Sequence, residues 1–210
     1  MIRSDRRSWP LAIGLSLLAG YVDAIGFQRL GGYFVSFMSG NGTMLALGLV
    51  APGGAAHGVA LLAALLALFV VGVMLGTLIR LILPRAGQPV VLVLVAMLLA
   101  GAAAVQGWAG LLMAVAMGAA NATFERDGEV SIGVTYMTGT LVKIGQHLAR
   151  MVAGRTRWAW VPYLLLWIGF VAGASLGALS YAQWGVAALW GAVMAALAAA
   201  AAAWTLSRAA

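Results

Sequence analysis

Long apolar runs separated by short polar stretches dominate the chain and determine the elements that it predicts. Spanning a bilayer takes about 20 predominantly apolar residues in a helix. Six runs approach or exceed that length, and each predicts a membrane-spanning helix. They are Trp9–Phe27, His57–Leu83, Pro89–Val105, Gly107–Phe124, Trp158–Ala182 and Trp184–Leu206.

Two further apolar segments, Gly32–Val50 and Ser131–Ala149, have a different pattern. Both contain hydroxyl side chains and internal glycines, and both offer too few helical residues to cross a bilayer. The preceding letters "YFVSF" and "IGVTY" are β-like, so we expect a strand-like approach to each short helix. The two segments share an aromatic-Met-hydroxyl-Gly motif, written "FMSG" in the first and "YMTG" in the second.

The similarity between the two halves extends beyond this motif. "GYVDA" in the first half matches "GAANA" in the second, which places Asp23 opposite Asn121. "GVMLGTL" likewise matches "GASLGAL", in the same order and at nearly the same offset. We therefore predict an internal duplication into residues 1–106 and 107–210. Each half would contain a helix, a broken hydroxyl-Gly segment and two further helices.

Composition changes the picture from apolar helices to a membrane protein. The chain is 64% hydrophobic and 8% charged, whereas a soluble domain is about a quarter charged. The net charge of +7 comes from basic residues placed singly or in small clusters between apolar runs, so nucleic-acid binding is not expected. The first apolar run imitates a secretory signal. Because it continues to Phe27, we expect it to remain as the first membrane helix.

The residue types also limit the chemistry. The absence of cysteine excludes disulfides and thiol catalysis, and two isolated histidines give no metal-ligand spacing. No Ser-His-Asp grouping, Walker loop or dinucleotide fingerprint occurs. We therefore expect neither an enzyme nor a cofactor.

The charges favour a topology in which the two short segments enter and leave on one side. With six crossings and a cytoplasmic N-terminus, the second half is inverted, and only Arg29 lies outside among the arginines. The arginines on the inner side would be Arg3, Arg6, Arg7, Arg80, Arg85, Arg126, Arg150, Arg155, Arg157 and Arg208. Eight crossings remain the alternative, with Arg80, Arg85 and Arg126 outside. The preferred fold class is an all-α polytopic membrane protein with six transmembrane helices plus two broken or re-entrant half-helices in an inverted repeat.

A half-helix that starts inside a membrane has free N–H groups and a partial positive charge at its tip, which suits an anion. Ser39 and Thr138 would be N-caps, and Gly40 and Gly139 would let a ligand approach closely. Paired broken helices of this kind form midplane sites in secondary transporters. Alternatively, these small residues only tighten helix packing. The predicted solute-binding residues are Asp23, Met38, Ser39, Gly40, Asn41, Thr43, Asn121, Met137, Thr138, Gly139, Thr140 and Lys143.

Asp23 and Asn121 both fall near the middle of the predicted membrane. At about 1.5 Å per residue, each lies ~20 Å from the surface at which its helix begins, within a core of ~30 Å. Asp23 could take up a proton, cap a half-helix or make a structural hydrogen bond. Lys143 could neutralise an anion, pair with Asp23 or Glu125, or extend to the cytoplasmic surface.

Four stretches carry a family resemblance: "GYVDAIGF", "SFMSGN", "MGAANA" and "TYMTGT". With these motifs in order, the chain resembles the YoaK-like family of small bacterial inner-membrane proteins, a domain of unknown function. The resemblance implies a bacterial polytopic membrane protein with about six spans and supplies no activity. The family often has Gln before the Asn of the third motif, where this chain has Ala120, which argues against a polar pair there contacting a solute.

The expected function is a membrane transporter or facilitator for a small polar, anionic solute that binds between the two half-helix tips. The alternative is a non-transporting structural or partner protein whose motifs serve packing. We expect a multi-pass protein of the bacterial inner membrane with both termini cytoplasmic. Its partners would be the lipid bilayer and the solute. A homodimer is an option because six spans leave a thin wall around a cavity.

Overall fold

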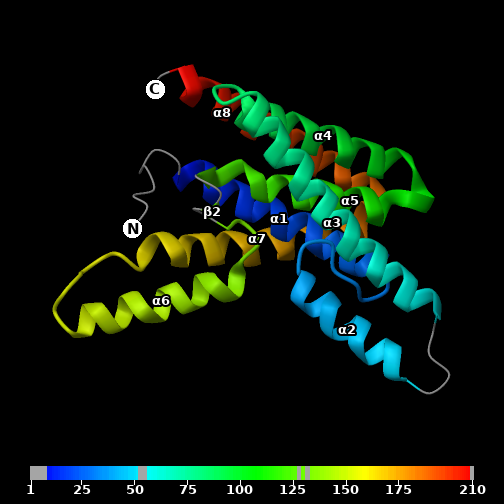
Figure 1. Cartoon of the computed structure of the whole chain (residues 1–210), viewed down its shortest axis with the longest axis horizontal. Helices are drawn as coiled ribbons and strands as arrows, with labels where there is room; N and C mark the ends of the chain where they lie inside the picture. Colours follow the sequence, from blue (N-terminus) through cyan, green and yellow to red (C-terminus); the bar gives the residue numbers. More distant parts are fainter. Residues whose placement is uncertain (1–8, 52–55, 127–128, 131–132, 209–210) are drawn as a thin grey trace.

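The computed structural model describes residues 9–51, 56–126, 129–130 and 133–208, and these residues are almost entirely helical (Figure 1). A two-residue antiparallel pairing of β1 and β2 interrupts the helices between α5 and α6. The elements are α1 (Trp9–Arg29), α2 (Met38–Val50), α3 (Ala56–Ile82), α4 (Gly87–Ala104), η2 (Gln106–Trp108), α5 (Ala109–Asn121), η3 (Ala122–Phe124), β1 (Glu125–Arg126), β2 (Glu129–Val130), α6 (Met137–Val152), α7 (Val161–Trp184), η4 (Gly185–Ala188) and α8 (Leu189–Arg208).

The long helices agree with the apolar runs of the sequence. Among the described residues, four helical segments are long and apolar enough to cross a membrane: Trp9–Arg29, Gly58–Ile82, Gly87–Ala104 and Val161–Arg208. The last has 48 residues and contains α7 and α8, which are separated at Gly185, where φ is 54°. The expected span Gly107–Phe124 is divided into η2, α5 and η3, and its apolar helix is shorter than the others. The fold is therefore that of a polytopic membrane protein, as predicted.

The short helices α2 and α6 also begin and end close to the predicted segments. They contain 13 and 16 residues. Both run outward from the middle of the molecule, in opposite directions (Figure 1). The expected strand-like approach is wrong for the described residues, because 33–37 and 133–136 form bends and irregular backbone. In the first segment the N–H groups of Val35 and Ser36 donate to Asp23, and in the second the N–H of Tyr136 donates to the carbonyl oxygen of Gly133, so these amides form no strand ladder.

Close helix pairs join the two halves of the chain. Three glycines of α7, at 169, 173 and 177, face α1, where a Cβ at Gly173 would overlap the carbonyl oxygen of Leu17. In the same way Gly72 and Gly76 of α3 face α5, and Gly118 of α5 faces α3. Glycine allows helix backbones this close, and in lipid such contacts replace the hydrophobic driving force. From the sequence, these glycines could pack either within one protomer or between two. In the structure they make contacts between helices of the same chain.

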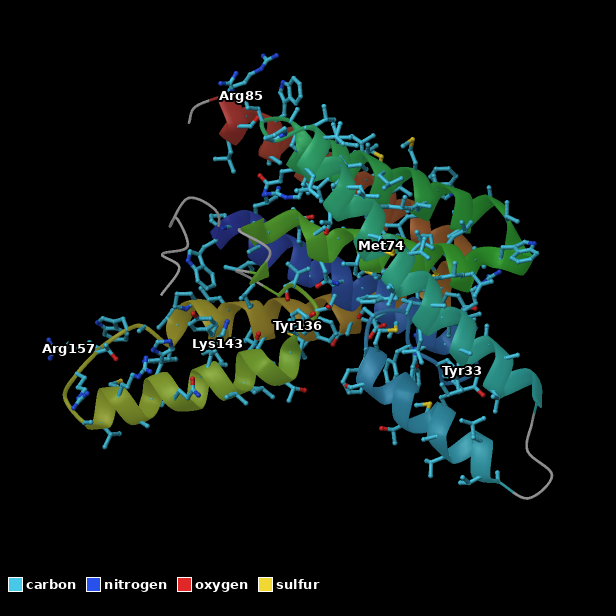
Figure 2. The ribbon with its side chains drawn as sticks, viewed as in Figure 1. Tyr33, Met74, Arg85, Tyr136, Lys143 and Arg157 are labelled. Atoms are coloured by element: carbon cyan, nitrogen blue, oxygen red, sulfur yellow. The ribbon has the colours of Figure 1, made fainter. Side chains whose placement is uncertain are left out.

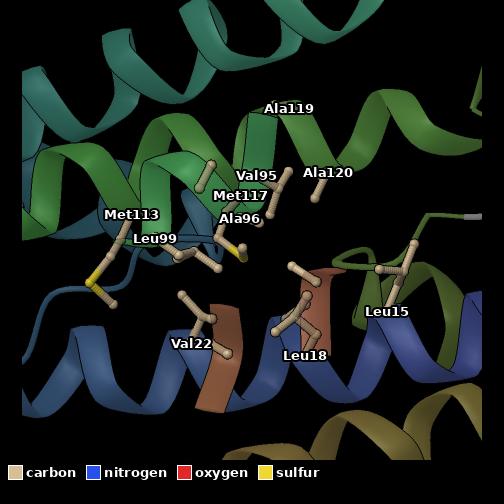
Figure 3. Packing of buried hydrophobic residues seen from close by; sticks show 14 of the residues in the cluster. Leu15, Leu18, Val22, Val95, Ala96, Leu99, Met113, Met117, Ala119 and Ala120 are labelled. Atoms are coloured by element: carbon tan, nitrogen blue, oxygen red, sulfur yellow. The ribbon is translucent and has the colours of Figure 1, made fainter. Parts of the chain in front are cut away.

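The apolar core lies where α1, α4, α5 and α8 meet (Figure 3). Leu15, Leu18 and Val22 of α1 are buried opposite side chains of α4 and α5. The labelled partners in Figure 3 are Val95, Ala96, Leu99, Met113, Met117, Ala119 and Ala120. The short helices lie outside this core, since α2 packs mainly on α3 and α6 mainly on α7.

We predict that Gly173→Val lowers thermal stability, because its side chain has no room beside the carbonyl oxygen of Leu17. Overpacking of about 1–3 kcal/mol would lower Tm by roughly 2–12 °C for a chain of this size, measured by thermal unfolding in detergent. Gly14→Val is the control, since a Cβ at Gly14 meets nothing within 4 Å. Equal Tm values for the two variants would contradict this account of the α1–α7 contact.

Candidate functional site

The start of the first short helix is held in place by Asp23 of α1. This carboxylate is 5% exposed, and its Oδ1 accepts hydrogen bonds from the N–H groups of Val35 at 2.9 Å and Ser36 at 2.8 Å. The chain reaches this position by reversing at Gly31 and Gly32, whose φ angles of 67° and 110° favour glycine. Asp23 thus fixes the point at which α2 begins.

Asn41 makes a second clamp on the same bend. Its Nδ2 donates to the carbonyl oxygen of Phe34 at 2.7 Å, and its Oδ1 accepts from the N–H of Phe34 at 3.0 Å. The side chain is fully buried, and its amide also lies 3.9 Å from the Met38 sulfur. Asp23 and Asn41 therefore satisfy backbone groups that would otherwise be left unpaired inside the protein.

The second half has the corresponding bend with fewer bonds. Asn121, the last residue of α5, accepts a hydrogen bond at its Oδ1 from the Thr135 hydroxyl at 2.9 Å. Its Nδ2 donates to the carbonyl oxygen of Met117 at 2.9 Å. Thr140, the match to Asn41, donates its hydroxyl to Tyr136 in its own helical turn at 3.0 Å. The second bend is consequently held by one side-chain contact to the preceding helix among the described residues.

The backbone of the two bends follows one pattern. In each half, the first helical N–H bonds to the carbonyl two residues before it, and the fourth bonds to the aromatic residue that precedes the helix. These bonds are Met38 to Ser36 at 3.0 Å, Met137 to Thr135 at 2.9 Å, Asn41 to Phe37 at 3.2 Å and Thr140 to Tyr136 at 2.9 Å. The two helix starts thus have the same local geometry.

The prediction that Ser39 and Thr138 are N-caps is wrong. The N-cap residues are Phe37 and Tyr136, and neither makes a side-chain capping bond. Asp23 of α1 binds the N–H of Ser36, and Asn121 of α5 binds the hydroxyl of Thr135, so each helix begins two positions before the expected start. Ser39 and Thr138 are exposed in the first turn.

This placement leaves backbone donors at each helix start. Among the described residues, the N–H groups of Ser39, Gly40, Thr138 and Gly139 have no hydrogen-bond partner, as expected for the first turn of a helix. The two starts differ in access. The Phe37 ring covers Gly40, whereas a Cβ at Gly139 meets nothing within 4 Å. The second helix start is therefore the more open of the two.

Aromatic rings surround the first helix start. The ring centroids of Phe27 and Phe34 are 4.8 Å apart, and those of Phe34 and Phe37 are 5.2 Å apart. A cavity of about 390 Å³ lies beside them between α1 and α7, and Asp23 lines it. Gln28 is the other polar side chain in its lining, and no residue of the second motif takes part. This cavity reaches one predicted site residue without joining the two helix starts.

Lys143 and the remaining predicted residues lie apart from Asp23. Lys143 is exposed on α6, and its Nζ is 5.3 Å from the ring centroid of Tyr163, a cation–π contact (Figure 2). It forms no ion pair with Asp23, and the side chain of Glu125 lies outside the described residues. The half-buried Met38 and Met137 are the first residues of their helices.

Thr43 is also away from the helix start. It is exposed on α2, and its hydroxyl donates to the carbonyl oxygen of Ser39 at 3.1 Å, within its own helix. Sequence reasoning overlooked three positions that build this region, namely Phe34, Thr135 and Tyr163. Thr135 could have been found, because a hydroxyl precedes the aromatic residue in both "VSF" and "VTY". Tyr163 follows no such pattern.

We predict that Asp23→Ala speeds amide hydrogen exchange at Val35 and Ser36, since each buried unpaired N–H costs about 1–3 kcal/mol. Exchange would rise by about fivefold or more at both amides. Asp23→Asn keeps an acceptor oxygen and should have a smaller effect. Thr43→Ala, which removes an exposed hydroxyl within α2, is the control and should leave both amides protected. Unchanged exchange in Asp23→Ala would show that the carboxylate does not hold the bend.

Comparison with known proteins places the chain in a family. Residues 11–202 match the profile of the family described as "Protein of unknown function (DUF1275)". The chain is 38% identical over 216 residues to the UPF0700 transmembrane protein RA0705 of Rhizobium meliloti (strain 1021), covering 99% of this chain and 92% of that protein. No solved structure matches. These matches confirm the resemblance carried by the four sequence motifs, and the chain belongs to the DUF1275 family of transmembrane proteins.

Proposed function

We propose that the chain is a membrane transporter or facilitator for a small polar, anionic solute that binds at the N-terminal ends of α2 and α6. One observation carries this proposal, namely the partnerless N–H groups at both helix starts. Ser39 and Gly40 supply them in α2, and Thr138 and Gly139 supply them in α6. Such donors, together with the helix dipole, attract anions and carbonyl oxygens. A lipid-facing helix start could not leave them unpaired.

We further propose that the two halves form an inverted repeat, which would bring equivalent helix starts to one region from opposite sides. The matching contacts support this. Gly20 of α1 approaches the carbonyl of Phe170, and Gly118 of α5 approaches the carbonyl of Phe69 in the same manner. Each half thus packs its first helix against the third helix of the other half. A two-fold axis that relates the two halves produces this arrangement, because the contact of α1 with α7 is then repeated as the contact of α5 with α3.

The directions of the helices support six crossings with α2 and α6 as re-entrant segments. The end of α1 lies beside the start of α5, because Leu30 contacts Gly110 and Gly26 approaches Met113. These two helices are therefore antiparallel. If α2 and α6 also crossed the membrane, α1 would be the first crossing and α5 the fifth. Odd-numbered crossings run in the same direction, so eight crossings would make these two helices parallel.

The basic residues support a cytoplasmic assignment for one end of the molecule. Arg85 and Arg157 lie toward the end at which α6 finishes, whereas Tyr33 lies toward the other (Figure 2). Arg29, at the end of α1, belongs with Tyr33. The positive-inside rule then makes the arginine-rich end cytoplasmic.

We predict the following accessibility to a membrane-impermeant maleimide, which the cysteine-free sequence makes simple to measure. Single cysteines at Gln28 and at Val50, which is 78% exposed, should both be labelled from outside in intact cells. Single cysteines at Arg85 and at Val152, which is 86% exposed, should be labelled only after permeabilisation. Labelling of Gln28→Cys and Val50→Cys from opposite sides would mean that α2 crosses the membrane.

Transport in this scheme requires the two halves to rock against each other around the helix starts. The short helices suit such a motion, since α2 packs mainly on α3 and α6 mainly on α7, away from the shared core. Each would move with the long helix that follows it. Solute would be exposed first to one side and then to the other.

A structural or partner role is the second candidate, and a specific observation favours it. Asp23 and Asn41, two of the most polar predicted site residues, make hydrogen bonds that hold backbone in place. The cavity beside Asp23 also involves only the first of the two motifs. In this interpretation the motifs serve to position α2 and α6.

We predict that Gly139→Val lowers solute uptake by purified protein in liposomes by about tenfold or more, because its side chain would obstruct the donors at the start of α6. The change should be tolerated, since a Cβ at this position has open space. Gly145→Val is a matched control on the same helix, also with open space, and should keep wild-type uptake.

The uptake assay would screen a panel of small anions and metabolites. Wild-type flux equal to that of empty liposomes across the panel would support the structural role. If the wild type transports a solute and Gly139→Val transports it equally well, the protein is a transporter but its solute site is not at the start of α6.

A further inference from the structure

The connection between α6 and α7 encloses a basic cavity that lies apart from the helix starts. The cavity is about 440 Å³ in volume, and its lining contains Arg155, Arg157, Thr156 and Trp158. No acidic side chain takes part in this lining. We refer to residues 154–158 together with Met151 as the α6–α7 corner.

The backbone of the α6–α7 corner has a defined shape. Gly154 turns the chain with a φ of 71°, and its N–H donates to the carbonyl oxygen of Met151 at 3.0 Å. The N–H of Arg155 donates to the carbonyl oxygen of Arg150 at 2.9 Å. These bonds close the end of α6 and place both cavity arginines directly after it. The two guanidinium groups therefore reach the cavity from an ordered turn.

One buried polar atom of the cavity residues lacks a partner. The hydroxyl of Thr156, a residue that lines the cavity, is buried without a hydrogen bond. Buried polar atoms in folded proteins are nearly always bonded, so this hydroxyl is a donor that a ligand could satisfy. Neither Arg155 nor Arg157 forms an ion pair with a carboxylate among the described residues. The two guanidinium groups and the Thr156 hydroxyl can donate to the same kind of ligand, one with several acceptor oxygens and negative charge.

A phosphate group fits this set of donors. Guanidinium groups bind phosphate oxygens through paired hydrogen bonds, and a threonine hydroxyl can donate to a third oxygen. The surroundings of the cavity favour a phosphate that belongs to a lipid. Val152 is 86% exposed and Trp158 is 71% exposed, so apolar surface suited to an acyl chain adjoins the basic cavity. Tryptophan and arginine together are typical of a membrane interface.

We propose that the α6–α7 corner binds the phosphate of an anionic phospholipid headgroup. The exposed apolar residues at the end of α6 lie against its acyl chains. This site is separate from the proposed solute site, because its residues follow the last turn of α6 and the solute site lies at the first turn. A bound lipid would anchor the C-terminal end of α6 at the cytoplasmic membrane surface.

Native mass spectrometry of the delipidated full chain tests this proposal. The protein would be titrated with phosphatidylglycerol, with phosphatidylcholine of the same acyl chains, and with inorganic phosphate. Phosphatidylglycerol should bind more tightly than phosphatidylcholine, and inorganic phosphate should not displace it at equal concentration. Equal binding of the two lipids would overturn the proposal. Displacement by phosphate would overturn the lipid as the ligand and assign the cavity to a free anion.

Two matched double variants separate the cavity from general surface charge. Arg155→Gln with Arg157→Gln should weaken phosphatidylglycerol binding by about 30-fold, from about 1 kcal/mol for each basic residue. Arg85→Gln with Arg208→Gln removes the same charge from exposed arginines outside the cavity and should change binding by less than about threefold. Equal losses in the two double variants would overturn the proposal.

Thr156→Val keeps both arginines and the shape of the side chain, so it tests the cavity even where the arginine variant does not fold. A loss of about tenfold or more in phosphatidylglycerol affinity is expected for one hydrogen bond to a charged group. If folded Thr156→Val protein binds phosphatidylglycerol with unchanged affinity, the hydroxyl does not contact the lipid, and the assignment of this cavity is overturned.

Discussion

The need to pair every backbone amide away from water governs this structure more than any other constraint. A helix meets that need by itself, but a bend that begins a helix inside the protein does not. At the first bend the carboxylate of Asp23 accepts from two amides, and Asn41 satisfies both backbone groups of Phe34. At the second bend Thr135 reaches Asn121 through its hydroxyl. Asp23, Asn41 and Asn121 are thus explained first by the bends, and any solute site uses the donors that remain.

Glycine contacts between long helices make the bends possible. Gly173 and Gly72 bring α7 against α1 and α3 against α5, so that backbones meet without intervening side chains. Helices packed this closely hold α1 and α5 where Asp23 and Asn121 can reach the bend that follows each of them. Because α2 and α6 lie outside the shared core, their position depends on the bends and on one long helix each.

The sequence predicted the helices correctly wherever the length and apolar character of a segment determine its structure. The long helices and the two short ones all form close to the predicted residues, because a run of apolar residues in a membrane has few alternatives to a helix. The N-caps could not be predicted in the same way. Ser39 and Thr138 have the preferred residue type, yet tertiary bonds to Ser36 and Thr135 moved both helix starts. The contact of Lys143 with Tyr163 likewise depends on how α6 folds back on α7, which no local pattern records.

The difference between Asp23 and Asn121 bears on how two similar halves could have different tasks. A carboxylate that accepts from two backbone amides, backed by Asn41, holds the first bend strongly. An amide that accepts from one hydroxyl holds the second less strongly, and its helix start is also the more open one. If both helix starts moved by the same amount, the solute would lose its contacts with α2 and α6 at the same time. Unequal bonding avoids this, because the strongly held start of α2 can remain fixed while the start of α6 shifts. Within the proposed scheme, the start of α6 is therefore the part that moves and the start of α2 the support.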